Sequence, residues 1–216
     1  MSESINLSGI VLSAMPVGEN DKRLVLLTCE EGKITAFARG ARRPRSTLLA
    51  ASNPFATGVF SVVPGRSAYS LTSAEIKEYF TDLAADMPGV YYGFYFLELA
   101  SYYGREGIES TDMLNLLYLS LKALLNPRFD DRLVRRIYEI RLMSLNGDYS
   151  PERADDSIRY TCRYICTAPL QKLFHFSVTP EILAGLEKHS DHWLSRVLDR
   201  KIRSRAILDD FTAPSS

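Results

Sequence analysis

The sequence predicts an α+β protein in which a small five-stranded β-barrel precedes an all-α helical domain. Up to about Phe80, short apolar runs alternate with turn residues, as is typical of strands. Beyond that point, apolar residues recur with the period of a helix. The 216 residues are enough for two small cores. We therefore expect one domain over residues 1–80 and a second over residues 81–216.

Five strands are expected in the first domain. The first contains Ile10 and ends near residues 16–18, and the others are expected over residues 23–29, 33–39, 55–63 and 67–76. Residues 40–54 are rich in Gly, Pro, Ser and Asn and predict a long loop. Five short strands at this spacing favour a closed or partly open barrel, because closure removes the exposed edges of an open sheet.

Six helices are expected in the second domain. They are predicted over residues 90–103, 113–125, 130–147, 155–167, 181–188 and 191–203. Asp112 and Asp130 are suitable N-caps, and Pro180 stands at a first helical position.

Composition excludes several classes of protein. No apolar run reaches the length of about 18 residues that spans a bilayer, and the N-terminus does not have the pattern of a secretory signal. A cytoplasmic protein is therefore expected. Three cysteines make no disulfide framework, and Cys162 and Cys166 lack a second pair to complete a zinc site. No phosphate-binding loop, nucleophile elbow or dinucleotide motif is present, so we expect no enzyme and no cofactor.

Charge is the clearest functional signal, although the formal net charge is zero. Residues 33–74 contain no acidic residue. The basic residues in that interval are Lys33, Arg39, Arg42, Arg43, Arg45 and Arg66. This is the pattern of a local positive field that can neutralise phosphates.

The placement of these charges favours nucleic acid as the ligand. In an alternating strand, Ile34 and Ala36 face the barrel interior while Lys33, Phe37 and Arg39 face outward. Phe37 offers a ring on which an unpaired base can stack. Residues 38–46, which follow this strand, form the predicted main contact. The alternatives are an ordinary solvated loop and a Phe37 that packs under the second domain.

Two further basic clusters lie in the helical domain. They comprise Arg128, Arg132, Arg135, Arg136 and Arg141, and Arg196, Arg200, Lys201, Arg203 and Arg205. Acidic residues are interleaved with both. Solvated helix faces are the simpler interpretation, and docking of an acidic partner is the alternative.

The order of several short motifs resembles the bacterial RecO family of recombination mediators. In the first domain these are residues 9–12 (GIVL), 18–22 (GENDK), 32–34 (GKI) and 38–44 (ARGARRP). In the second they are Tyr91-Tyr92, Tyr95, Glu98-Leu99, Arg163-Tyr164, Pro169-Leu170, Lys172-Leu173 and residues 201–208 (KIRSRAIL). The resemblance covers nearly the whole chain.

The resemblance implies an OB-fold barrel followed by a helical domain. It implies a repair protein that binds single- and double-stranded DNA, anneals complementary strands, and helps load the strand-exchange recombinase onto DNA coated with single-stranded-DNA-binding protein. The implied partners are RecR, sometimes RecF, and the acidic C-terminal tail of the single-stranded-DNA-binding protein. For that tail we consider Arg132, Arg135 and Arg136. Cytoplasmic, nucleoid-associated localisation follows.

One departure from the family concerns zinc. Many members carry a four-cysteine knuckle in the helical domain, whereas residues 145–158, at the corresponding place, contain no cysteine. We therefore expect no metal. Two other functions remain open, an RNA-binding OB-fold protein and a protein-interaction scaffold.

Overall fold

The computed structural model describes residues 3–151 and 156–212, which form two compact units. The barrel unit comprises Met1–Thr81 and Leu97–Leu114, and the helical unit comprises Asp82–Phe96 and Asn115–Ser216. Residues 97–114, which lie in the predicted second domain, thus group with the barrel.

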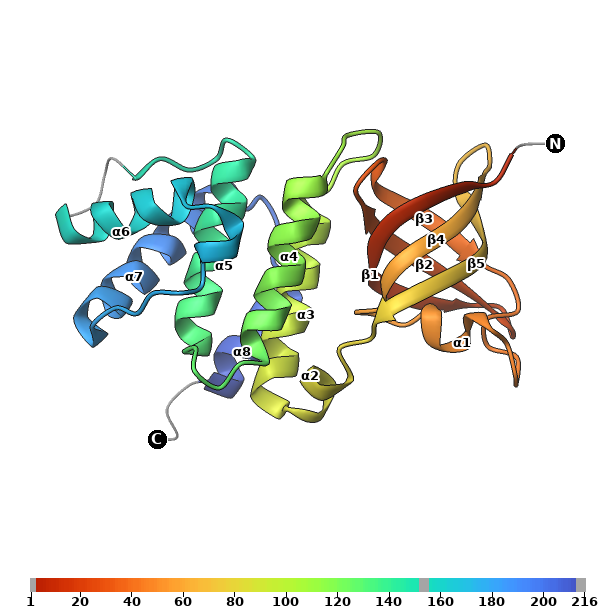
Figure 1. Cartoon of the computed structure of the whole chain (residues 1–216), viewed down its shortest axis with the longest axis horizontal. Coiled ribbons are helices and arrows are strands. Elements are labelled where there is room, and N and C mark those ends of the chain that lie inside the picture. The colour runs from red at the N-terminus through yellow and green to blue at the C-terminus, as the bar shows by residue number, and fades with distance from the viewer. Residues whose placement is uncertain (1–2, 152–155, 213–216) are drawn as a thin grey trace. The chain divides into compact units, whose positions relative to one another are not determined.

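Five strands build the barrel (Figure 1). They are β1 (Ile5–Val17), β2 (Asp21–Thr28), β3 (Gly32–Ala38), β4 (Thr57–Pro64) and β5 (Tyr69–Glu78). The order around the barrel is β1-β2-β3-β5-β4, closed by β4 pairing with β1. Among the described strands, β3 and β5 pair in parallel and the other neighbouring pairs are antiparallel. The predicted fold class, an OB-like barrel followed by helices, is confirmed.

Side-chain alternation along β3 fills the barrel interior. Ile34, Ala36 and Ala38 are buried in a core that also contains Phe60, whereas Lys33, Thr35 and Phe37 are half-buried on the outer surface. Small side chains on this strand suit the tight interior of a five-stranded barrel.

A short helix, α1 (Leu48–Ala51), lies inside the stretch predicted to be a loop. Leu48 belongs to the barrel core. Burial of that side chain accounts for the turn of helix, because four residues are too few to be helical on propensity alone.

The turn between β2 and β3 is hydrogen-bonded to residues 105–107, which lie in the second segment of the barrel unit. Lys33 N donates to Arg105 O at 3.0 Å, and Gly107 N donates to Glu31 O at 3.0 Å. Gly32, at φ 63°, has the carbonyl oxygens of Arg105 and Ile108 where a Cβ would stand. Glycine is required here on both grounds.

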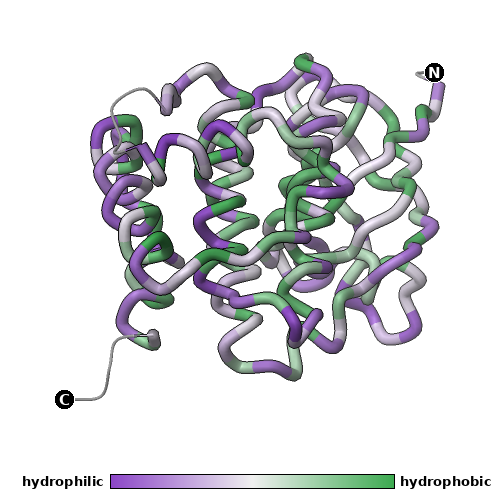
Figure 2. Tube along the Cα trace, turned by 60° about the vertical axis from the view of Figure 1, so that its left-hand side comes forward, coloured by the Kyte–Doolittle hydropathy of each residue, from purple (hydrophilic) through white to green (hydrophobic). Residues whose placement is uncertain are grey.

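The remaining elements are helical (Figure 1). They are α2 (Thr81–Ala85), α3 (Met87–Tyr103), α4 (Thr111–Leu124), α5 (Asp131–Leu145), α6 (Asp156–Thr167), the 3-10 turn η2 (Leu170–Lys172), α7 (Pro180–Val197) and α8 (Arg203–Thr212). Asp155, the predicted start of the helix found as α6, lies outside the described residues. Green and purple segments alternate along the helices near the C-terminus in Figure 2, the pattern of helices that bury one face.

The C-terminal helices differ from those predicted. The helices expected over residues 181–188 and 191–203 are a single helix, α7, and α8 follows where no helix was predicted. Ser190, at the expected break, is buried and donates to Glu139 at 2.6 Å, which holds the helix continuous at that position. Burial of Leu208 anchors α8.

A buried charge network joins the elements of the helical unit. Glu139 on α5 is completely buried and accepts hydrogen bonds from Tyr95 on α3 at 2.7 Å and from Ser190 on α7. Arg135 and Arg136 donate to the same carboxylate at 2.9 and 2.8 Å. Four donors thus satisfy one carboxylate, which offsets the cost of burying its charge.

Among the described residues, no helix is long and apolar enough to span a membrane.

Candidate nucleic-acid interface

The predicted basic loop is exposed. Arg39, Arg42, Arg43 and Arg45 all lie on the surface after the end of β3. Over residues 3–151 and 156–212, no carboxylate forms an ion pair with any of these four guanidinium groups. Their charges are therefore not neutralised within the described part of the barrel unit.

The loop is held in place by the turn between β1 and β2. Arg42 N donates to Asn20 O at 2.8 Å, and Gly40 N donates to the Asp21 carboxylate at 2.8 Å. The Arg42 guanidinium also donates to Gly18 O at 3.2 Å. Arg42 thus has a structural role in addition to its charge, whereas its neighbours Arg39 and Arg43 project from the fixed backbone.

Lys22 adds a further positive charge at this place. Its ammonium donates to Asn53 Oδ1 at 2.7 Å and to Ser52 O at 3.2 Å. Burial, together with the nearby charge of Arg42, lowers the pKa of Lys22. The sequence did not single out this residue, because a lysine at the start of a strand carries no distinctive signal.

Arg45 has a left-handed backbone conformation, with φ of 66°. This region is unfavourable for a residue with a Cβ, at a cost on the order of 1 kcal/mol. The Arg45 side chain is exposed and makes no ion pair with the described carboxylates. The strained backbone thus holds an exposed guanidinium that no described carboxylate neutralises.

Replacement of Arg45 by glycine is expected to stabilise the protein while weakening DNA binding. Glycine adopts the left-handed conformation without strain, so the free energy of unfolding should rise by about 0.5 kcal/mol. Loss of one phosphate contact should lower the affinity for DNA about threefold. Arg43→Gly is the matched control, because Arg43 has no positive φ. It should lose affinity without gaining stability in chemical denaturation, and equal stability changes in the two variants would show that Arg45 is not strained.

Lys33 is placed differently from the loop arginines. Its ammonium donates to Ser101 O at 2.7 Å, in the last turn of α3. A cation at a helix C-terminus interacts favourably with the unpaired carbonyl groups there. The structure thus gives the Lys33 side chain a stabilising role within the barrel unit, and its part in DNA contact stays a prediction.

Phe37 lies in a row of outward-facing side chains that crosses the barrel. The register pairs Phe37 with Arg23 of β2 on one side and with Ser70 of β5 on the other. Arg23 is in turn opposite Met15 of β1, and Ser70 is opposite Val63 of β4. Arg23 was not predicted as a site residue, although the alternation of residues 23–26 places it on the same face.

Arg66 is exposed in the turn between β4 and β5 and is not part of the loop cluster. Tyr69 pairs with Ala36 on the parallel strand β3, so the turn that precedes Tyr69 lies toward the start of β3. The loop arginines follow the end of β3. The predicted basic residues therefore occupy both ends of the outward face rather than one patch.

The three arginines considered for an acidic partner differ in exposure. The side chain of Arg132 is 56% exposed and forms a bidentate pair with Glu187, with N–O distances of 2.9 and 2.8 Å. Arg135 and Arg136 are buried, and besides Glu139 they bond Asp209 and Asp191, each at 2.7 Å. Of these three arginines, only Arg132 presents its guanidinium at the surface.

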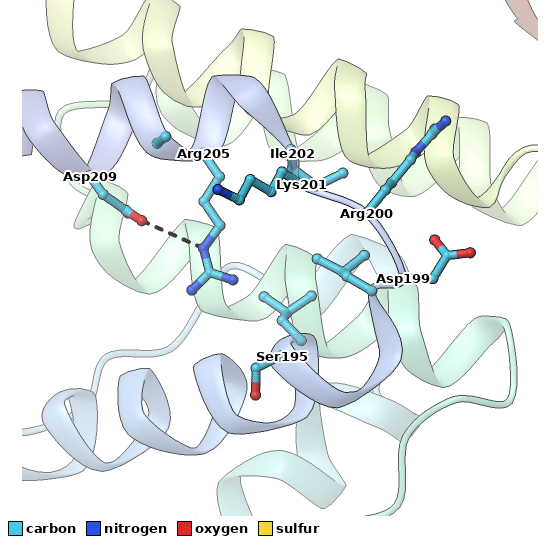
Figure 3. A pocket seen from close by; sticks show the side chains of 10 residues that line it. Ser195, Asp199, Arg200, Lys201, Ile202, Arg205 and Asp209 are labelled. Carbon is cyan, nitrogen blue, oxygen red and sulfur yellow. Dashed lines mark ion pairs between the residues drawn. The ribbon is translucent and has the colours of Figure 1, made fainter.

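The described residues of the helical unit form at least three pockets. One, of about 520 Å³, is lined by Arg132, Arg135 and Arg136 together with the carboxylates of Glu187, Asp191 and Asp209. Another, of about 590 Å³ between α7 and α8, is lined by Arg200, Lys201 and Arg205 and also by Asp199 and Asp209. Figure 3 shows Arg205 directed at Asp209, to which it is ion-paired at 3.5 Å. The mixed charges give this pocket little net attraction for a polyanion. A third pocket, of about 120 Å³, is lined mainly by apolar side chains that include Phe129, Leu133 and Phe174, with Arg128 also in its wall.

Cys162 is buried and Cys166 is half-buried on α6. Burial raises the pKa of Cys162 to about 11, and burial also raises the pKa of Cys166. In residues 3–151 and 156–212, no three His, Cys, Asp or Glu side chains are grouped so that they could hold a metal ion.

Comparison with known proteins supports the family resemblance found in the sequence motifs. Residues 1–80 match the family model described as "Recombination protein O N terminal". The chain is 36% identical to the DNA repair protein RecO of Alkaliphilus metalliredigens over 143 residues, which cover 66% of this chain and 58% of the relative. It is 37% identical to the RecO of Symbiobacterium thermophilum over 142 residues, which cover 66% of this chain and 56% of the relative.

A third alignment extends over most of both chains. The RecO of Acetivibrio thermocellus is 25% identical over 233 residues, covering 91% of this chain and 92% of the relative. The alignments with the more similar relatives span a little more than half of those proteins.

Proposed function

The chain belongs to the RecO family of DNA repair proteins, and on this premise we propose that it is a non-enzymatic recombination mediator. In this proposal it binds single- and double-stranded DNA, anneals complementary strands, and helps load the strand-exchange recombinase onto DNA coated with single-stranded-DNA-binding protein. The observation that carries the proposal is the exposed loop with Arg39, Arg42, Arg43 and Arg45, whose charges no described carboxylate neutralises.

The proposed mechanism makes and breaks no covalent bond. Two DNA strands repel each other through their phosphates, and this repulsion slows their pairing. Guanidinium groups that neutralise phosphates lower the repulsion and release counterions. A loop fixed at its base but exposed at its arginines can contact backbones of different sequence, because phosphate contacts position a strand without reading its bases.

DNA contact is assigned to the domain of residues 1–80 and partner docking to residues 81–216. The proposed DNA-binding residues are Phe37, Arg39, Arg42, Arg43, Arg45 and Arg66, with Lys33 retained chiefly as a residue that positions β3. The proposed partners are RecR, possibly RecF, and the acidic tail of the single-stranded-DNA-binding protein. For the tail, exposed Arg132 is favoured over Arg135 and Arg136, because their burial and their existing carboxylate partners leave them poorly accessible.

Affinity for single-stranded DNA is expected to depend strongly on salt. If about four phosphates are contacted, a plot of log affinity against log salt concentration should have a slope near −3. Fluorescence anisotropy of a labelled oligonucleotide, titrated at several NaCl concentrations, measures this slope. An affinity independent of salt would contradict backbone recognition by the loop.

Annealing of complementary strands precoated with single-stranded-DNA-binding protein tests the mediator role. The wild type should accelerate annealing, whereas the double variant Arg39→Glu/Arg43→Glu should not. Two alternative functions have distinct outcomes. Preference for RNA over a DNA strand of matched sequence in competition would favour an RNA-binding protein, and absence of any DNA binding at low salt would favour an interaction scaffold.

A further inference from the structure

The helix α8 depends on docking for its structure. Of its ten residues, only Leu208 is buried. Arg203 and Arg205 lie at its N-terminal end, and Asp209 and Asp210 lie near its C-terminal end. This order is the reverse of the one that the helix dipole favours. Because a helix of this length is also marginal in isolation, contacts with its neighbours rather than its own sequence hold α8 helical.

Two ion pairs attach α8 to the helices beside it. Asp209 pairs with Arg135 of α5 at 2.7 Å, and Arg205 pairs with Asp191 of α7 at 3.0 Å. The two carboxylates are 47% and 43% exposed, so water competes for both pairs and each contributes little. Asp209 also lines the pockets of about 590 and 520 Å³, which leave unfilled space where α8 packs (Figure 3).

Asp209 satisfies the Arg135 guanidinium only in part. It accepts one hydrogen bond, from Nη1, while Nε of Arg135 donates to Glu139. Nη2 of Arg135 and Nε of Arg136 are buried and have no hydrogen-bond partner among the described residues. Both side chains line the 520 Å³ pocket and are only 5% and 7% exposed. A carboxylate that bonds Nη1 and Nη2 of Arg135 together binds more strongly than one held by a single bond.

We propose that α8 is a displaceable strap, and that an acidic, apolar peptide of a partner binds Arg135 in place of Asp209. This inference deepens the partner docking proposed for residues 81–216 and rests on it. While α8 is docked, Arg135 is covered and the site is closed to carboxylates from outside. A partner that displaces α8 gains the position that Asp209 leaves, beside exposed Arg132.

The chemistry of the expected ligand follows from α8 itself. Next to Asp209, the strap buries Leu208 and places the ring of Phe211 4.6 Å from that of Tyr91 on α3. A peptide that carries a carboxylate between apolar side chains offers the same contacts. Residues 198–202, between α7 and α8, form no helix, so α8 can leave while α7 keeps its place.

Hydrogen exchange in the full chain, followed by mass spectrometry, tests whether α8 is released. Asp209→Asn removes the charge that pairs with Arg135 and should raise amide exchange over residues 203–212 about fivefold, with the other helices unchanged. Phe211→Ser removes the contact with Tyr91 and should act in the same direction, without touching the buried charge network. Asp210→Asn is the matched control, because Asp210 forms no ion pair with the described residues, and it should exchange like the wild type.

Binding of a peptide tests whether the vacated site accepts an acidic, apolar segment. The probe is a fluorescein-labelled peptide with the sequence of residues 203–212, titrated with the full-length variants in fluorescence anisotropy. Asp209→Asn should bind it about fivefold more tightly than the wild type, because the site is open in a larger fraction of molecules. The same peptide with both aspartates replaced by asparagine should bind that variant at least about tenfold more weakly, since it brings no carboxylate to Arg135.

The strap is overturned if exchange over residues 203–212 does not rise in Asp209→Asn, or if Asp209→Asn and Asp210→Asn bind the peptide equally. Affinity for single-stranded DNA should be the same in all of these variants, because the changes lie in α8 and not in the barrel unit. A failed strap therefore leaves the proposed DNA binding intact. Conversely, normal DNA binding by Arg39→Glu/Arg43→Glu would overturn the proposed DNA site without changing peptide binding.

Discussion

Replacement of Arg39 and Arg43 together by glutamate should weaken binding of single-stranded DNA by about 30-fold at moderate salt and abolish strand annealing. Both side chains are exposed, and neither has a carboxylate partner among the described residues, so the change adds repulsion without breaking an ion pair. The salt slope should fall in magnitude by about 1.5, because each lost single-strand phosphate contact accounts for about 0.7. Fluorescence anisotropy at a series of salt concentrations measures both quantities.

The choice of these two arginines follows from the geometry of the loop. Arg42 is left unchanged because its guanidinium donates to Gly18 O and its reversal would also disturb the loop. Lys77→Glu is a suitable control for a change of net charge on β5, away from the loop. If the double variant keeps its fold and its affinity, the DNA site lies elsewhere.

Replacement of Glu139 by glutamine should lower the free energy of unfolding by about 3 kcal/mol or more. Glutamine has nearly the shape of glutamate but no charge, so Arg135 and Arg136 remain as buried cations beside a neutral side chain. The amide NH2 of glutamine is itself a donor, and it would face donors where the carboxylate accepts four hydrogen bonds. Chemical denaturation measures the change. DNA binding by the barrel unit should be affected only as far as the protein unfolds.

Glu187→Gln is the matched control for this prediction. The substitution is the same, but Glu187 pairs with Arg132 at the surface, where an ion pair contributes less than about 1 kcal/mol. Simultaneous replacement of Arg135, Arg136 and Glu139 by Met, Leu and Leu should restore much of the stability, since no buried charge is then left unpaired. Similar losses in Glu139→Gln and Glu187→Gln would contradict the special cost of the buried network.

The same network predicts how stability depends on pH. Burial opposes the charge of Glu139, but Arg136 and Arg135 together with the Ser190 hydroxyl hold its pKa at about 2. Because this folded-state pKa lies below the unfolded value, the stabilisation is complete above about pH 4.5 and is lost as pH falls toward 2. The wild type should therefore lose stability across this window, and Glu139→Gln should lose less.

Part of the proposed DNA site could be predicted from local pattern. The absence of acidic residues between Lys33 and Glu75, and the alternation that exposes Phe37, are properties of short stretches of chain. The position of Arg23 beside Phe37 could not be predicted in this way. It depends on which residue of β2 is opposite Phe37, and strand register is decided by long-range pairing.

For individual cations too, local pattern predicts the charge but tertiary packing decides the role. Lys33 and Arg39 belong to one alternating pattern, yet Lys33 donates to the end of α3, 68 residues further along the chain, while Arg39 remains at the surface. Arg135 and Arg136 resembled part of a solvated basic helix, but both are buried against Glu139. A sequence gives the charge of a side chain, whereas its partner is set by packing between distant elements.

By itself, the sequence determined the α+β class, the change from strands to helices near Phe80, the basic loop and the resemblance to the RecO family. These depend on residue type and on periods of two or 3.6 residues, which are local. Only the tertiary structure decided the barrel order, the continuity of α7, the separation of Arg66 from the loop, and which arginines are neutralised. Those features depend on contacts between residues far apart in sequence. Such contacts contribute to the free energy of folding only once the chain has packed.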